Sequence, residues 1–274
     1  SFPTRRSSDL GFSVRLESEI GRERIGYAAR IVLKSIGIEH EEEEPNYLDE
    51  MLARFNNAFP KTTEFSAYAR STLRGLSSLD DPDAALVAWM EREEALFRTF
   101  EKHVLGEQLR RLMKAGTEEV EPYIKLVQSA LQRRKSRAGS ALENHLEQIF
   151  REHGISYTKC GITENRLKPD FVFPGIECYH NASFPADCLT MLAAKATCKD
   201  RWRQILNEAA RIPRKHLLTL EPGISEFQTD EMQKEQVHLV VPKSVHSSYA
   251  SRQQKWLLDV GGFLAIVRRR QRSF

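Results

Sequence analysis

The chain has 274 residues, of which 41% are hydrophobic and 29% are charged. A chain of this length and composition can bury a substantial core, which excludes collagen-like, rod-like coiled-coil and wholly disordered proteins. Its longest apolar runs have the length of a strand and fall far short of the about 20 residues that cross a bilayer, so we expect no membrane span and no membrane partner.

The formal net charge of +3 is unevenly distributed. Residues 1–130 carry a formal charge of −5, whereas residues 131–274 carry +8. The basic second half indicates a polyanionic partner, with nucleic acid as the leading candidate, although a solvent-exposed surface rich in lysine and arginine explains the same charge. The four cysteines form no CxxC pair, so we predict no structural zinc site. No secretory signal is visible, so we expect reduced thiols in the cytoplasm.

The first residues differ in character from the rest of the chain. Residues 1–10 have neither an initiator methionine nor hydrophobic periodicity, and they resemble translated sequencing-adapter DNA, so we expect a non-native leader. Residues 11–44 end in an acidic block at 39–44, and we interpret them as the remnant of an upstream domain or as a linker. The main folded domain is then expected over residues 45–274.

Hydrophobic spacing predicts a mainly helical N-terminal part over residues 45–153. Apolar residues recur at helical intervals over about 84–115, after an acidic stretch that supplies capping groups. A second helix is predicted over about 119–134. A third is predicted to begin at Gly139 or Ser140, because Glu143 completes a capping box three residues after Ser140, and to end at Gly154.

After Gly154 the pattern changes to short apolar runs separated by helical segments. Helices are predicted at about 199–211, 226–234 and 252–259. Strands are predicted at 155–159, 171–173, 189–194, 216–220, 237–241 and 263–267. This order predicts an α/β fold in which a mixed central sheet is flanked by helices, with the α/β core over about 139–268.

Three residues of this part have the chemistry of a phosphodiester-cleaving site. Asp170 precedes an apolar strand, Lys195 follows the next strand, and Glu208 lies 13 residues further on the predicted helix. Two carboxylates suit Mg²⁺, which activates a bound water, and an ammonium can orient that water and stabilise developing negative charge. The same residue types also occur together as surface charges or ion pairs, so spacing alone leaves both interpretations open.

Several longer strings resemble EcoRII-type restriction endonucleases. The resemblance runs from about residue 55 to 268, corresponds to the catalytic C-terminal domain of that family, and is carried by strings at 133–139, 142–146, 168–171, 194–209, 215–220 and 222–225. It implies the restriction-endonuclease-like fold of the PD-(D/E)XK nuclease superfamily, a mixed sheet flanked by helices. Residues 45–274 would then be an endonuclease catalytic domain.

The resemblance assigns roles to the acidic residues. Asp170 and Glu208 match metal ligands for Mg²⁺, and Lys195 matches the catalytic lysine. The common superfamily pattern has an acid two residues before the lysine, where this chain has Ala193. In the branch that the chain resembles, the second acid is displaced to the following helix, at the position of Glu208.

Two further positions match residues near the chemistry. Glu143 matches an acid on the first core helix that supports the metal or the water, with Glu147 one turn further as a rival. Tyr179 lies where the family has a tyrosine near the scissile phosphate. An aromatic residue of the core or its rim is the alternative for Tyr179.

The resemblance also indicates DNA contacts. Lys199, Asp200 and Arg201 match a base-reading cluster, in which the cations bind guanine and the acid accepts from cytosine. Asp200 as an acid at a helix N-terminus is the alternative. A second basic group is expected to contact phosphates or, alternatively, to form a solvated turn; it comprises Arg133, Arg134 and Arg137.

The function implied is that of a Mg²⁺-dependent, sequence-specific endonuclease of double-stranded DNA with a CC(A/T)GG-like site. A near-palindromic site implies a homodimer, and a cognate DNA methyltransferase and a prokaryotic cytoplasm are expected with it. Family members carry an N-terminal effector domain, of which only the tail could lie in residues 11–44. Two alternatives are a PD-(D/E)XK repair nuclease and a sequence-specific DNA-binding module that does not cleave.

Overall fold

The computed structural model describes residues 47–116, 119–198 and 201–273, all within one compact unit that spans Glu43–Phe274. The predicted leader at 1–10 and the predicted remnant at 11–44 lie outside the described residues. No described helix is long and apolar enough to cross a membrane.

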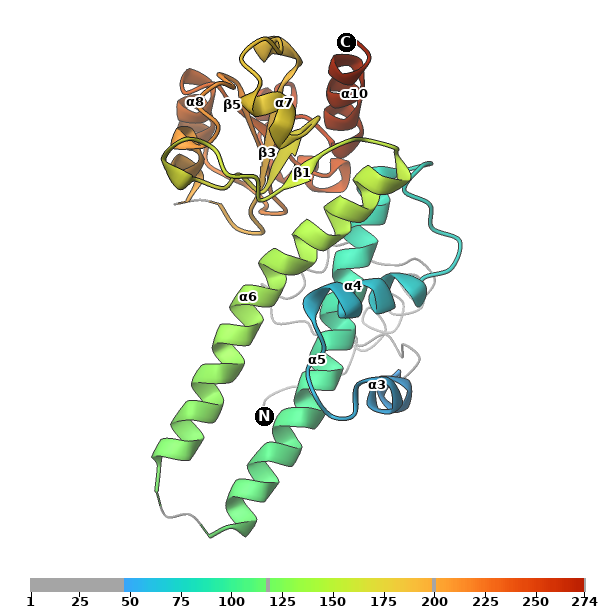
Figure 1. Cartoon of the computed structure of the whole chain (residues 1–274). Helices are drawn as coiled ribbons and strands as arrows, with labels where there is room; N and C mark the ends of the chain where they lie inside the picture. The colour runs from blue at the N-terminus through green and yellow to red at the C-terminus, as the bar shows by residue number, and fades with distance from the viewer. Residues whose placement is uncertain (1–46, 117–118, 199–200, 274) are drawn as a thin grey trace, which may run out of the picture. The chain divides into compact units, whose positions relative to one another are not determined.

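The N-terminal part of this unit is helical, as predicted. It comprises α3 (Leu48–Phe55), α4 (Thr62–Ser71), α5 (Pro82–Lys114) and α6 (Glu121–Glu152). The long helices α5 and α6 form a hairpin, α3 packs against α5, and α4 crosses the hairpin in contact with both long helices (Figure 1). Asp81 caps α5 by accepting from the backbone N–H groups of Asp83 and Ala84, and Pro82 occupies the first helical position, where no N–H donor is needed.

Helix α6 is continuous from Glu121 to Glu152, so the predicted separate helices, with a new start at Gly139 or Ser140, are wrong. A single glycine costs a helix only about 1 kcal/mol, which packing readily offsets. The basic residues before Gly139 favour helix as well, and two of their side chains, those of Arg134 and Arg137, form ion pairs with glutamates on α5.

Five strands form one mixed sheet in the order β1-β2-β3-β4-β5. The strands β1, β2 and β3 are antiparallel neighbours, whereas β3, β4 and β5 are parallel. Their bounds are β1 (Thr158–Lys159), β2 (Phe171–Phe173), β3 (Thr190–Ala194), β4 (Lys215–Leu218) and β5 (Val237–Val240). The predicted mixed sheet is thereby confirmed, and the three central strands are buried throughout.

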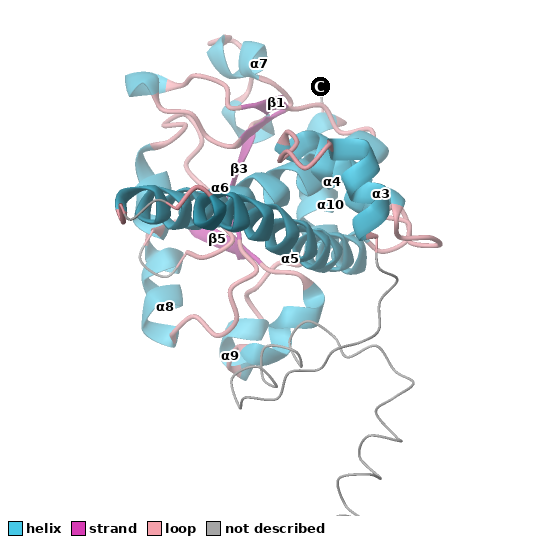
Figure 2. Cartoon of the chain, turned by 90° about the horizontal axis from the view of Figure 1, so that it is seen from below, coloured by secondary structure: helices cyan, strands magenta, loops and turns pink. Residues whose placement is uncertain are grey.

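Helices flank this sheet (Figure 2). A single apolar cluster joins residues of α5, α6 and α10 (Val260–Gln271) to β2, β3, β4 and β5. Helix α8 (Glu226–Lys234), predicted with the same bounds, lies beside β5. Two short helices complete this part, α7 (Ile176–His180), which was not predicted, and α9 (Ser251–Gln254), which covers only the start of the predicted 252–259 helix.

Two elements of the α/β part differ from their prediction. Residues 263–267, predicted as a strand, lie inside α10, whose N-terminus is capped by Asp259 through the N–H of Gly262. A short apolar run has no periodicity that separates a buried strand from a buried helix. The predicted 199–211 helix is a 3₁₀ helix, Trp202–Asn207, over the described residues.

Candidate active site

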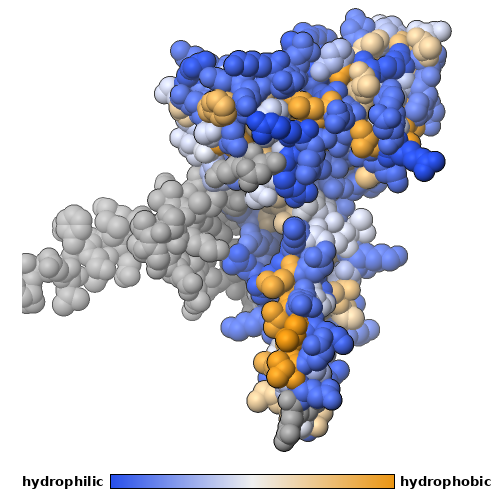
Figure 3. All heavy atoms as spheres, turned by 90° about the vertical axis from the view of Figure 1, so that its left-hand side faces the viewer, coloured by the Kyte–Doolittle hydropathy of each residue, from blue (hydrophilic) through white to orange (hydrophobic). Residues whose placement is uncertain are grey.

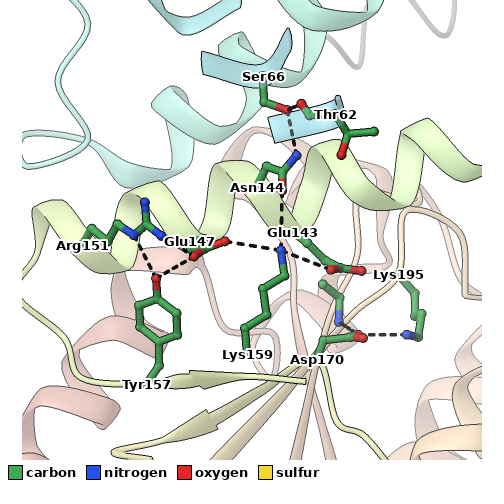
Figure 4. A network of polar contacts seen from close by, with 11 residues as sticks. Thr62, Ser66, Glu143, Asn144, Glu147, Arg151, Tyr157, Lys159, Asp170 and Lys195 are labelled. Carbon is green, nitrogen blue, oxygen red and sulfur yellow. Dashed lines mark hydrogen bonds and ion pairs between the residues drawn. The ribbon is translucent and has the colours of Figure 1, made fainter. Parts of the chain in front are cut away.

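The antiparallel pairing of β2 with β3 brings Asp170 to the end of β3. Phe171 pairs with Leu192, so Asp170 lies beside the last residues of β3. Its Oδ2 accepts from the N–H of Ala194 at 2.8 Å and from the Lys195 ammonium at 2.8 Å (Figure 4). The two side chains are 13% and 20% exposed, so the pair can reach a substrate while most of its surface is shielded from water.

Glu208 joins this pair from an extended segment. It directly follows the 3₁₀ helix, with φ −78° and ψ 143°, so its predicted position on an α-helix is wrong. Its Oε2 is buried and has no hydrogen-bond partner in the described part of the chain. Burial, and then the negative charge of Asp170, raise the pKa of Glu208 from 4.5 to about 7 against the opposing effects of Lys195 and Lys215.

A buried lysine holds the turn that follows Glu208. Ala209 has a left-handed backbone, with φ 48°, which costs an alanine about 1 kcal/mol. The Lys215 ammonium, at the start of β4, donates to the carbonyl oxygens of Ala209 at 3.3 Å and Ile212 at 2.9 Å. Burial lowers the pKa of Lys215, and the charge of Glu208 opposes this shift. Lys215 was not identified as a functional residue from the sequence, although a lysine that opens an apolar strand is a visible signal.

Glu143 approaches the acidic group from α6. Burial, and then the charge of Asp170, raise the pKa of the Glu143 carboxyl, and Lys159 opposes this shift. The Lys159 ammonium, from β1, lies 3.4 Å from Glu143 Oε2. Three carboxyl groups, from Glu143, Asp170 and Glu208, therefore interact around Lys195.

Glu147 is engaged on the other side of Lys159 (Figure 4). Its Oε2 lies 3.3 Å from the Lys159 ammonium, and its Oε1 accepts from the Tyr157 hydroxyl at 3.1 Å and from Arg151. These contacts distinguish Glu147 from Glu143, because the interaction with Asp170 belongs to Glu143. Lys159 was not identified from the sequence.

The donor set suits one hard divalent cation. The partnerless, buried oxygen of Glu208 and the mutual repulsion of Glu208 and Asp170 indicate a site built for positive charge. No group of three His, Cys, Asp or Glu side chains among the described residues is arranged to hold a metal ion by itself. Mg²⁺ commonly binds through one or two carboxylates and completes its shell with water and substrate phosphate, so Asp170 and Glu208 fit it.

Comparison with known proteins identifies the family. A family model described as EcoRII C terminal matches residues 97–264. The chain belongs to the EcoRII C-terminal family. The type II restriction enzyme EcoRII of Escherichia coli is 43% identical over 209 residues, which are 76% of this chain and 50% of that enzyme. The chain thus spans about half the length of this relative, and the resemblance seen in the sequence is confirmed.

Solved structures of restriction enzymes share the fold of this EcoRII C-terminal domain. Metal-depleted Ecl18kI in complex with uncleaved, modified DNA is similar with a TM-score of 0.66 and 20% identity, covering 83% of this chain and 84% of that one. The restriction endonuclease PspGI in its substrate DNA complex is similar with a TM-score of 0.65 and 17% identity, covering 79% and 95%. These likenesses establish the restriction-endonuclease-like fold that the sequence predicted.

Tyr179 lies in the family domain as a buried residue of α7. Its hydroxyl donates to Glu164 and accepts from the backbone N–H of Arg211 at 3.2 Å. Burial, and then the hydrogen bond with Glu164, raise the pKa of Tyr179 to about 12. The contacts that the structure describes for this hydroxyl tie α7 to the turn after Glu208 and do not include Asp170.

We therefore expect Tyr179→Phe to lower the stability of the fold more than the rate of cleavage. Loss of the hydroxyl leaves the Arg211 N–H and Glu164 without this partner, which should lower the free energy of unfolding by about 1–2 kcal/mol. The cleavage rate should change less than about threefold, equivalent to less than 1 kcal/mol. Urea unfolding and single-turnover cleavage would measure the two effects. A large loss of rate at unchanged stability would instead support the catalytic role implied by the resemblance.

The candidate DNA contacts are only partly described. Lys199 and Asp200 lie outside the described residues. Arg201 is exposed at the start of the 3₁₀ helix, on the segment that connects Lys195 to Glu208. Arg133 stacks on Phe59, with its guanidinium carbon 3.9 Å from the ring centroid. Arg134 is 59% exposed and its Nε lies 2.6 Å from Glu101 Oε2. 

Arg137 occupies the interior of the helical part. Its guanidinium lies between the rings of Phe65 and Phe97, at 4.4 and 4.5 Å from their centroids, and 3.4 Å from Glu93. The side chain is only 7% exposed and lies within α6, so the alternative of a solvated turn is wrong for Arg137, and its buried contacts do not suit the phosphate contact that was predicted for it. Arg137 instead joins α6 to α4 and α5.

We expect Arg137→Gln to lower the free energy of unfolding by about 3 kcal/mol, because it leaves the buried Glu93 carboxylate without its cation. The matched change Arg98→Gln should cost less than about 1 kcal/mol, since Arg98 and its partner Glu94 are both exposed. Equilibrium unfolding in guanidinium chloride would compare the two variants. Equal losses would contradict the different roles of these two arginines.

Proposed function

We propose that this chain contains the catalytic domain of a Mg²⁺-dependent, sequence-specific endonuclease that hydrolyses phosphodiester bonds of double-stranded DNA. The observation that carries the proposal is the buried, partnerless carboxylate oxygen of Glu208 beside the Asp170–Lys195 pair. The membership of the chain in the EcoRII C-terminal family and its 43% identity to a type II restriction enzyme support the same activity.

The site residues divide the chemistry among them. Asp170 and Glu208 would hold Mg²⁺, which supplies activation of a water molecule and neutralises negative charge at the phosphate. Lys195, 2.8 Å from Asp170, would orient the attacking water and stabilise charge that develops on the phosphate oxygens. Glu143 would support the water or the metal from α6, its carboxylate being positioned by Lys159.

DNA recognition is assigned to two basic groups. Lys199, Asp200 and Arg201 would read base edges, and the family implies a CC(A/T)GG-like site. Arg133 and Arg134 would contact phosphates; Arg134 lies nine residues before Glu143 on α6, about 14 Å along the helix. Arg137 is left out of this set because it is buried.

The biological setting follows from this activity. A near-palindromic target is read most simply by a homodimer in which each subunit cuts one strand. A cognate DNA methyltransferase would protect host DNA, and the enzyme would act in a prokaryotic cytoplasm. The two similar structures are of restriction enzymes in complex with DNA, which supports double-stranded DNA as the partner.

Digestion of unmethylated plasmid DNA, with and without Mg²⁺, tests the proposal. Wild-type protein should give discrete Mg²⁺-dependent fragments with ends at CC(A/T)GG, and Lys195→Ala should abolish them. Smearing or structure-dependent nicking would instead identify a PD-(D/E)XK repair nuclease. A specific gel shift without cleavage, under conditions in which the protein is folded, would identify a DNA-binding module.

A further inference from the structure

The backbone that follows β3 is tied to the backbone that follows β4. The N–H of Lys195 donates to the carbonyl oxygen of Leu218 at 2.9 Å, which continues the parallel pairing of the two strands. Three residues later, the N–H of Cys198 donates to Oε2 of Glu221 at 2.6 Å. A carboxylate that accepts from a backbone N–H forms a charge-assisted hydrogen bond, which is shorter and stronger than a neutral one. Lys195 and Cys198 are therefore both held by one short stretch of chain, residues 218–221.

Glu221 is itself fixed by its own backbone. Its N–H donates to the Thr219 hydroxyl oxygen at 3.1 Å, and the same hydroxyl donates to the carbonyl oxygen of Ala196 at 3.4 Å. Its carbonyl oxygen accepts from the hydroxyl of Tyr249 at 2.6 Å. Thr219 and Tyr249 are buried, so these hydrogen bonds are shielded from competing water. The Glu221 carboxylate is thus carried by a braced backbone.

The contact between Glu221 and Cys198 lies at the start of the proposed base-reading cluster, residues 199–201. Cys198 is only 1% exposed, and its carbonyl oxygen accepts from the N–H groups of Arg201 at 2.9 Å and Trp202 at 3.1 Å. Trp202 is also 1% exposed, whereas Arg201 is exposed. The backbone on both sides of the cluster is therefore anchored in the interior, while the side chain of Arg201 is open to a ligand.

A carboxylate has a cost beside a surface that binds DNA, because it repels phosphate. Residues 131–274 carry a formal charge of +8, which Glu221 reduces. The side of the α/β part that carries α8 presents a mainly hydrophilic surface (Figure 3), which suits a polyanionic duplex better than an apolar partner. The contacts of Glu221 therefore indicate that it holds the backbone of this chain and does not attract DNA.

We propose that Glu221 is a positioning residue for sequence recognition. Its carboxylate fixes the start of the cluster 199–201 relative to Lys195, so that the groups that read bases and the group that acts at the phosphate keep a constant separation. Only three residues separate Lys195 from Cys198, and a backbone this short and this firmly bound transmits a shift at one end to the other. The inference rests on the proposed function, because it takes residues 199–201 as the base-reading cluster.

Hydrogen exchange tests the contact without any assay of activity. In the full chain without metal or DNA, Glu221→Ala should raise the exchange rate of the Cys198 N–H by about tenfold or more, because this N–H then has no acceptor. Glu221→Gln should keep most of the protection, since its amide oxygen can accept the same hydrogen bond. Glu235→Ala, at an exposed residue directly after α8, is the matched control and should leave the rate unchanged. Equal rates in the wild type and Glu221→Ala would overturn the proposed contact.

Cleavage of paired duplexes tests the consequence for specificity. The measured quantity is the ratio of kcat/KM for a CC(A/T)GG duplex to that for a duplex with one base pair of the site changed. Glu221→Ala should lower this ratio by about tenfold or more, because displaced reading groups lose contacts that only the correct bases make. Glu221→Gln should retain most of the ratio. A merely structural role would lower the amount of folded enzyme, reduce both rates equally and leave the ratio unchanged, which would overturn the proposal.

Binding without Mg²⁺ separates this inference from the nuclease proposal. Lys195→Ala, which removes the proposed chemistry, should still bind the CC(A/T)GG duplex in preference to the altered one, whereas Glu221→Ala should lose most of that preference. A wild-type protein without any preference would overturn the proposed function and this inference together. A wild-type preference that Glu221→Ala fully retains would overturn this inference alone.

Discussion

Replacing Glu208 with glutamine is expected to lower the rate of Mg²⁺-dependent DNA cleavage by about a thousandfold, which corresponds to about 4 kcal/mol of transition-state stabilisation. Glutamine keeps the shape of the side chain but removes the negative charge that a hard cation requires. The buried Oε2 of Glu208 has no hydrogen-bond partner among the described residues, so it is available to bind a cation. Single-turnover cleavage of a duplex carrying the site would measure the loss.

Glu147 and Glu143, both on α6, provide the comparison. Glu147→Gln makes the same chemical change at a residue held by Arg151 and Tyr157, and it should alter the rate by less than about threefold, or less than 1 kcal/mol. Glu143→Gln should have an intermediate effect, about tenfold, because Glu143 interacts with Asp170 without being a proposed ligand. A loss in Glu147→Gln as large as that in Glu208→Gln would contradict the assignment.

The Glu208 carboxyl should make the stability of the metal-free protein depend on pH. The pKa of Glu208 is raised from 4.5 to about 7, first by burial and then by Asp170. The folded protein therefore binds this proton more tightly than the unfolded chain, so its stability falls as the pH rises through this interval. In EDTA, Glu208→Gln should melt above the wild type at pH values beyond 7, and the difference should shrink below pH 4.5 or when Mg²⁺ is added. A difference in melting temperature that does not vary with pH would contradict this origin.

Local sequence signals predicted the elements that depend least on distant contacts. Helix α8 has the predicted bounds, and all five strands of the sheet lie within or beside predicted runs. Placing Asp170 and Lys195 at the ends of consecutive strands anticipated their contact, because neighbouring strands bring such ends together. These features follow from periodicity and from short connections along the chain.

The features that were missed depend on partners far away in the sequence. The continuity of α6 past Gly139 is supported by contacts such as that of Arg137 with Glu93, 44 residues earlier. The strand-like run at 263–267 is helical because α10 buries Phe263 and Val267 against the sheet and α5. Lys159 acquires its role only when β1 brings it to Glu143, and Lys215 acquires its role only when β4 brings it to the turn after Glu208. Glu208 could be matched to the displaced second acid from the sequence. The hydrogen bonds of Lys215 that hold the turn after Glu208 could not be predicted in the same way.

Lys215→Met is expected to lower the free energy of unfolding by about 3 kcal/mol, because two carbonyl oxygens lose their donor and the buried Glu208 loses a nearby cation. Cleavage by the protein that remains folded should fall by about a hundredfold, since a shift of about 1 Å in a catalytic group can have that effect. Lys234→Met, at an exposed residue of α8, is the matched control and should change neither property.

A merely structural role for Lys215 would lower the fraction of folded protein and leave the folded molecules fully active. A positioning role would raise the Mg²⁺ concentration needed for half-maximal cleavage, because Glu208 would no longer be held in its place beside Asp170. Titration of cleavage with Mg²⁺ at a temperature at which Lys215→Met is fully folded distinguishes the two. An unchanged Mg²⁺ requirement would contradict positioning. A raised one would show that a lysine on the adjacent strand, together with the left-handed Ala209, holds the displaced acid where no α-helix does.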